Sequence, residues 1–101
     1  GKAIGTFGKE KGYGICQGLS GHGVGYSVHE DPYVPNEGKK GQGEKLKSGM
    51  VIAIEPMFSL GSDQIVLDKD GYTYKTKDGS NAAHFEHTVA ITDEGVFVLT
   101  K

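Results

Sequence analysis

Three segments of the chain place metal-ligand side chains in apolar or glycine-rich surroundings. His22 lies in the sequence GHGVG, Glu55 in IEP and Glu86 in FEH. Glu55 follows five uncharged residues, 50–54, and a carboxylate in an apolar strand is costly unless it is paired, protonated or bound to a metal. Imidazole and carboxylate together suit Mn, Fe, Co or Zn. The pattern leaves two readings open: a divalent-metal site, or a Glu55 paired with a lysine or backbone amide beside a structural His22.

The other imidazoles and the single thiol carry weaker signals. His29 precedes Glu-Asp-Pro and by itself is typical of a loop. His84 lies two residues before Glu86, so on a strand both would face one side; His84 is then either at the edge of a site or solvated. His87 would face the opposite side, in a structural role. Cys16 is typical of a small core residue.

These side chains must be positioned by short elements, of which the first is a helix. Residues 2–11 are consistent with the last turns of a helix, weakened by two glycines, and Gly12 is a suitable stop. Residues 13–17 and 24–29 are expected to be extended, with a glycine-rich turn at 18–23 between them.

The rest of the chain predicts a loop, a buried strand and two hairpins. Residues 32–49, rich in glycine and lysine, indicate a surface loop, and residues 51–58 a buried strand interrupted at Pro56. Turn signals at Asp-Gly and Glu-Gly predict two hairpins, which pair 65–67 with 72–76 and 83–92 with 96–100. The fold class is therefore α+β, mainly antiparallel strands with a helix remnant at the N-terminus.

Composition limits the compartment and the partners. The chain has 101 residues, a net charge of −2 and one cysteine. A single thiol forms no internal disulfide, which fits the reducing cytoplasm. No apolar run reaches the roughly 18 residues that a membrane span needs. We expect neither nucleic acid nor a membrane as a partner.

Taken together, longer strings resemble a known enzyme family. They are GHGVGYSVHEDPYVP, LKSGMVIAIEPM, KDGYTYKTKDGS, FEHTVAITDEG and VLT, which cover nearly the whole chain in order. This ensemble resembles the type I methionine aminopeptidases, and EPM distinguishes it from the prolidase branch, which usually shows EPG. The resemblance implies the pita-bread fold, with two divalent metals per complete site between two pseudo-symmetric halves. It also implies removal of the initiator methionine from nascent proteins, with the ribosome as a further partner.

The resemblance also implies roles for individual residues. His22 matches a histidine metal ligand, Glu55 a carboxylate ligand that is also proposed as general base, and Glu86 the carboxylate that bridges both metals. His29 matches a catalytic histidine that hydrogen-bonds the scissile amide of the substrate.

Other positions match the methionine pocket, with departures. Met57 and Tyr72 match pocket-lining positions, and Val28 lies at the pocket edge. Tyr72 replaces the usual tryptophan, Val28 a common phenylalanine, and His84 a frequent glutamine. These departures imply a pocket of altered shape and leave the metal ligands in place.

The family's two aspartate ligands and a further substrate-contacting histidine belong to an N-terminal half, and this chain begins after them. The aspartates present fall in predicted turns or at strand ends: Asp63, Asp68, Asp70, Asp78 and Asp93. We therefore expect residues 1–101 to be a C-terminal half. By itself it would bind at most one metal weakly, lack peptidase activity, and pair with an N-terminal half or self-associate. The alternatives are a non-catalytic pita-bread binding module and a split half-domain.

Overall fold

The computed structural model describes residues 1–101 as one helix and ten strands. The largest sheet has five antiparallel strands in the order β10-β9-β4-β2-β3. Its strands are β2 (Gly21–Gly23), β3 (Glu30–Val34), β4 (Val51–Ile54), β9 (His87–Thr92) and β10 (Gly95–Val98).

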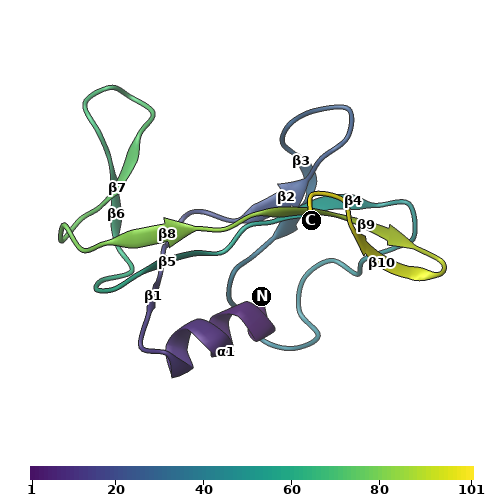
Figure 1. Ribbon diagram of the computed structural model, residues 1–101, viewed down its shortest axis with the longest axis horizontal. Helices are drawn as coiled ribbons and strands as arrows, with labels where there is room; N and C mark the ends of the chain where they lie inside the picture. Colours follow the sequence, from purple (N-terminus) through teal and green to yellow (C-terminus); the bar gives the residue numbers. More distant parts are fainter.

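A second sheet continues the first at one end. It has three antiparallel strands in the order β1-β5-β8, which are β1 (Gly14–Ile15), β5 (Met57–Ser59) and β8 (Ala82–His84). Since β4 leads into β5 and β8 leads into β9, two long chain segments cross both sheets side by side (Figure 1). The remaining hairpin, β6 (Ile65–Leu67) with β7 (Tyr74–Thr76), projects from the far end of this layer (Figure 1).

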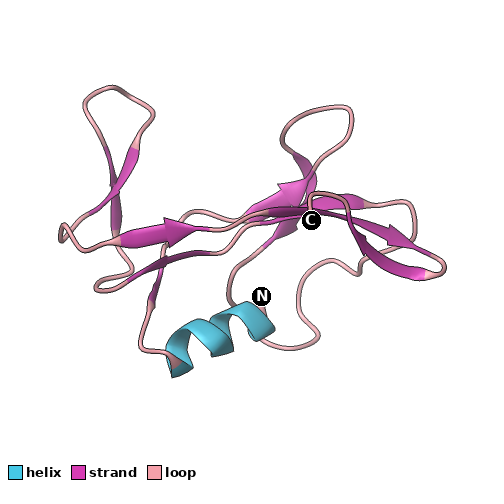
Figure 2. Ribbon diagram, viewed as in Figure 1, coloured by secondary structure: helices cyan, strands magenta, loops and turns pink.

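Helix α1 (Lys2–Glu10) lies on one face of the layer, as Figure 2 shows. Phe58 of β5 anchors it: the Phe58 ring stacks on Phe7 at 6.4 Å between centroids and on Tyr13 at 5.8 Å. Gly8 meets the same ring, so the helix can approach closely at a position without a side chain. With nine residues, α1 falls short of the length that a membrane-spanning helix requires.

The core is small and has two parts: Ile15 and Cys16 are buried at β1, and the other buried apolar residues lie on β4 and β9. Ile52 and Ala53 are each 1% exposed and Val89 of β9 is also buried, whereas many large apolar side chains remain exposed. An apolar groove of about 690 Å³ runs between α1 and the strands β5 and β8. An uncovered apolar groove is a candidate surface for association with another chain.

Most predicted elements are confirmed. The helix occupies Lys2–Glu10 and ends before Gly12, whose φ of 76° is the left-handed conformation favoured just past a helix. The strand interrupted at Pro56 is present as β4 and β5. The hairpin β6–β7 lies where the Asp-Gly turn predicted it, and β9 and β10 pair across the second turn.

Three local predictions are wrong. Residues 24–29 form no strand; β2 instead lies at Gly21–Gly23, inside the predicted turn. A Cβ at Gly21 would collide with the carbonyl oxygen of Ala53, and one at Gly23 with that of Asp31. These glycines therefore serve close strand packing rather than a turn.

The other two errors concern strand bounds. β3 (Glu30–Val34) extends into the predicted loop at 32–49, because it pairs with β2 along the edge of the sheet. The predicted strand at 83–92 is two strands, since β8 pairs with β5 and β9 pairs with β4 and β10. The break between them falls at residues 85–86.

Candidate metal centre

Two carboxylates face each other where the two sheets join. Ile54 of β4 pairs with His87 of β9, and Met57 of β5 pairs with His84 of β8. Glu55 and Glu86 lie between these pairs, at matching breaks in neighbouring antiparallel segments. Like charges opposite each other on adjacent strands destabilise a sheet, so this arrangement calls for positive charge between them.

His22 supplies one polar partner from β2. Its register opposite Ala53 brings Nε2 to 2.8 Å from Glu55 Oε1, and both side chains are largely buried. The other ring nitrogen, Nδ1, lies 2.8 Å from the carbonyl oxygen of Gly23. A carbonyl only accepts, so Nδ1 carries a proton and donates it to Gly23.

This tautomer determines which species can lie between His22 Nε2 and Glu55 Oε1. In neutral His22 the proton on Nδ1 leaves a lone pair on Nε2, aimed at a carboxylate oxygen. Two electron-rich atoms at 2.8 Å require a proton or a cation between or beside them. Histidines that bind a metal through one ring nitrogen usually donate the N–H of the other ring nitrogen to a backbone carbonyl or carboxylate.

A cation fits the three side chains together. One ligand atom from each of His22, Glu55 and Glu86 can be chosen so that all lie within 4.8 Å of one another. The Glu55 side chain is only 12% exposed while that of Glu86 is 42% exposed, so solvent reaches the cluster mainly at Glu86. One imidazole and two carboxylates are donors that suit Mn, Fe, Co or Zn.

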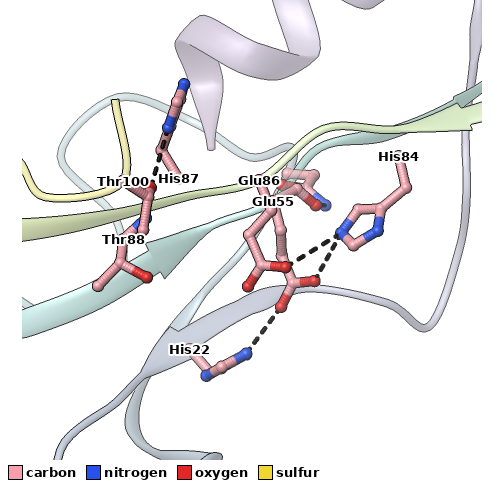
Figure 3. Close-up of polar contacts among 8 residues, drawn as sticks. His22, Glu55, His84, Glu86, His87, Thr88 and Thr100 are labelled. Carbon is pink, nitrogen blue, oxygen red and sulfur yellow. Dashed lines mark hydrogen bonds and ion pairs between the residues drawn. The ribbon is translucent and has the colours of Figure 1, made fainter.

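His84 is the fourth member of the cluster. Its Nε2 lies 2.9 Å from Glu55 Oε2 and 3.8 Å from Glu86 Oε2 (Figure 3). Glu55 thus has one imidazole at each carboxylate oxygen. The sequence left His84 between a site-edge and a solvated role, and the structure decides for the first. The usable signal was its spacing of two residues from Glu86.

A cavity of about 370 Å³ adjoins the cluster. His22, Glu55, His29 and Met57 line it together with residues 18–20. The His29 ring meets the His22 ring edge-on at 4.4 Å between centroids, although His29 by itself indicated only a loop residue. Residues from three separate segments of the chain therefore share one cavity beside the cluster.

The other two predicted pocket residues lie outside this cavity. Val28 is 73% exposed and Tyr72, in the turn between β6 and β7, is 81% exposed. Neither lines the cavity that His29 and Met57 share. Their substrate roles stay predictions.

Polar residues away from the cluster have local partners. His87 points away from Glu55, and its Nδ1 lies 3.0 Å from Thr100 Oγ1, which agrees with a structural role (Figure 3). Cys16 is buried, and this burial, with Asp63 nearby, raises the pKa of its thiol. Such a thiol is a core residue rather than a nucleophile.

Three aspartates around the β6–β7 hairpin have local hydrogen-bond or ionic partners and do not join the cluster. Hydrogen bonds from the Ser62 amide and from Ser80 lower the pKa of Asp78 to about 2. Lys75 lowers the pKa of Asp68, and Thr73 lowers that of Asp70. These carboxylates are engaged within the β6–β7 region and its flanking turns, as the sequence predicted.

The amino-acid sequence matches those of a known metallopeptidase family and of curated relatives. The model of metallopeptidase family M24 matches residues 1–93. The chain is 53% identical over 104 aligned residues to a methionine aminopeptidase of Aquifex aeolicus, covering 99% of this chain and 40% of that protein. It is 51% identical to methionine aminopeptidase 1 of Mycobacterium tuberculosis, covering 89% of this chain and 34% of that protein. The chain thus spans well under half the length of these curated relatives.

Solved structures agree on the fold. A methionine aminopeptidase of Thermotoga maritima superposes with a TM-score of 0.92 at 47% identity, over 97% of this chain and 39% of that one. A prolidase of Thermococcus sibiricus superposes with a TM-score of only 0.57 at 28% identity, over 97% of this chain and 20% of that one. The sheet and helix therefore form part of the pita-bread fold, and the chain is closer to the methionine aminopeptidase structure than to this prolidase, as the EPM sequence indicated.

Proposed function

The chain belongs to metallopeptidase family M24, and on this premise we propose that residues 1–101 are the C-terminal half of a methionine aminopeptidase. The complete protein removes the initiator methionine from nascent polypeptides. The observation that carries this proposal is the convergence of His22, Glu55 and Glu86 at one point between facing strands. The similarity to methionine aminopeptidases over nearly the whole chain supports the same activity.

We propose that His22, Glu55 and Glu86 would hold the divalent cations, of which the complete site would bind two, with Glu86 as the carboxylate that both would share. Co, Mn, Fe and Zn all suit imidazole and carboxylate donors. When bound, such cations polarise the scissile carbonyl and lower the pKa of an attacking water. His22 holds its lone pair toward them because Gly23 accepts the proton on its other ring nitrogen.

The catalytic and substrate roles fall to side chains around the adjoining cavity. Glu55, largely buried, acts as general base for the attacking water. His29, which reaches the same cavity, donates to the scissile amide as negative charge develops there. Met57, Val28 and Tyr72 contact the methionine side chain, which requires an apolar surface of suitable shape.

The remaining donors are proposed to come from the rest of the protein. Glu55 and Glu86 supply two negative charges, whereas two dications carry four positive ones. The 101-residue chain alone therefore binds at most one cation, weakly, and has negligible peptidase activity. The apolar groove between α1 and the strands β5 and β8 favours pairing with an N-terminal half, or self-association when that half is missing.

We propose that the enzyme acts in the cytoplasm, where a nascent chain leaving the ribosome is its substrate. The free thiol of Cys16 is compatible with such a reducing compartment. Neither a membrane nor a nucleic acid is included among its partners.

Hydrolysis of a Met-Ala-Ser peptide tests the proposal. The complete protein, loaded with Co or Mn, should release methionine, and Glu86→Gln should abolish release. Glu94→Gln, in the turn between β9 and β10, makes the same chemical change away from the cluster and should retain activity. A complete protein that binds its metals yet releases no methionine would contradict the proposed activity and favour a non-catalytic binding module.

A further inference from the structure

We propose that His84 is a positioning residue that fixes the Glu55 carboxylate for cation binding, an inference that rests on the function proposed above. Glu55 Oε1 faces His22 at 2.8 Å, and Oε2 faces His84 at 2.9 Å. Figure 3 shows the two imidazoles approaching the carboxylate from opposite sides. An imidazole from β2 therefore faces one carboxylate oxygen, and an imidazole from β8 faces the other.

The direction of the second hydrogen bond follows from chemistry. A carboxylate only accepts, so Nε2 of His84 carries the proton and donates it to Glu55 Oε2. A neutral imidazole with its proton on Nε2 makes this bond, so His84 need not be positively charged. That nitrogen then has no lone pair for a metal, so His84 acts on Glu55 and does not coordinate a cation through Nε2.

The two histidines around Glu55 thus differ in role. Nδ1 of His22 donates to the Gly23 carbonyl, which leaves Nε2 as the electron-pair donor. His84 donates through Nε2 instead. His22 would therefore bind the cation together with Glu55, while His84 hydrogen-bonds the other oxygen of the Glu55 carboxylate.

Holding Oε2 has an energetic consequence for binding at Oε1. The terminal torsion of a glutamate is broad, so a free carboxylate must be ordered when the cation binds. His84 orders the Glu55 carboxylate beforehand and leaves Oε1 facing His22. Because His84 on β8 pairs with Met57 on β5, its side chain lies close to Glu55, two residues before Met57. Loss of such a partner behind a metal ligand typically weakens metal binding by about 10–100-fold.

Three substitutions of His84 separate the hydrogen bond from other roles. In glutamine the terminal amide nitrogen is as many bonds from Cα as Nε2 of histidine, so His84→Gln can donate to Oε2. The amide nitrogen of asparagine corresponds in reach to Nδ1 and falls short. His84→Ala removes the donor altogether. His87→Ala is the matched control, because it removes an imidazole that bonds Thr100 and points away from Glu55.

Co²⁺ binding to the complete protein measures the effect directly, by calorimetric titration and by the visible absorption of the bound ion. His84→Ala and His84→Asn should weaken binding by about 10–100-fold and alter the absorption spectrum. His84→Gln and His87→Ala should bind like the wild type and give its spectrum. In steady-state kinetics, kcat should fall for His84→Ala and His84→Asn and stay near the wild-type value for His84→Gln and His87→Ala, with KM little changed.

Two results would overturn the inference. If His84→Ala binds Co²⁺ as tightly as the wild type, the Glu55–His84 bond does not position the ligand. If His84→Gln is as weak as His84→Ala, imidazole itself is required and His84 is a direct ligand. In either case the wild type still binds cations and the proposed function stands. A wild type that binds no cation, by contrast, contradicts both proposals at once.

Discussion

Glu86→Gln is a substitution that separates metal ligation from structural support. Glu86 is 42% exposed, and its one ionic contact is His84 at 3.8 Å, longer than a hydrogen bond. Exchange of such a surface carboxylate for its amide usually changes the free energy of unfolding by no more than about 0.5 kcal/mol. With a chelator present, the complete protein should therefore melt within about 2 °C of the wild type, at roughly 2–4 °C per kcal/mol for a protein of its relatives' size.

The same substitution should remove the stabilisation that cations provide. At a metal concentration 100 times the wild-type Kd, binding adds about 2.7 kcal/mol to the free energy of unfolding. This corresponds to a rise in Tm of about 5–11 °C. Loss of a ligand should weaken binding at least as much as loss of a partner behind it, about 100-fold. Then only about 0.4 kcal/mol remains at the same metal concentration, a rise of about 1–2 °C.

Thermal unfolding with chelator and with Mn²⁺ measures both quantities. Glu94→Gln makes the same change of charge outside the cluster and should keep the full metal-dependent rise. The reasoning is refuted if Glu86→Gln lowers the Tm in chelator by several degrees, since Glu86 would then be a structural residue. It is equally refuted if Glu86→Gln retains the wild-type rise with Mn²⁺.

Three further predictions concern stability and reactivity. The folded pKa of Asp78 is about 2, below its unfolded value, so its contribution is complete above the unfolded pKa and is lost as pH falls through 2. The Tm of Asp78→Asn should thus lie below that of the wild type at pH 5–7, with the gap closing toward pH 2; a gap independent of pH would contradict this. Ile52→Val should lower the free energy of unfolding by about 0.5–1.5 kcal/mol in denaturant titrations, because Ile52 is 1% exposed at the centre of the sheet. The Cys16 thiol should react with a disulfide reagent only at the rate at which the protein opens, because burial covers the thiol and raises its pKa. A reaction of the folded protein as fast as that in denaturant would contradict the burial of Cys16.

Local residue chemistry was enough to predict most of the fold. The Asp-Gly turn between β6 and β7, the interruption at Pro56 and the helix stop at Gly12 each depend on conformational preferences of a few adjacent residues. The strand at Gly21–Gly23 was missed because glycine is common both in turns and where backbones pack closely. Only the neighbouring carbonyls of Ala53 and Asp31 distinguish the two uses, and they belong to other segments.

The ligand types were also evident from the sequence, since His22, Glu55 and Glu86 each stand in apolar or glycine-rich surroundings. That these three converge was an expectation from family resemblance and could not follow from spacing. Convergence depends on strand register, which places Glu55 opposite Glu86 across the junction of two sheets. The spacing of His84 from Glu86 indicated a position at the edge of the site, but its hydrogen bond to Glu55, 29 residues away in the chain, depends on the pairing of β5 with β8. Sequence determined which side chains could bind a cation, while pairing between distant strands decided which atoms of those side chains meet.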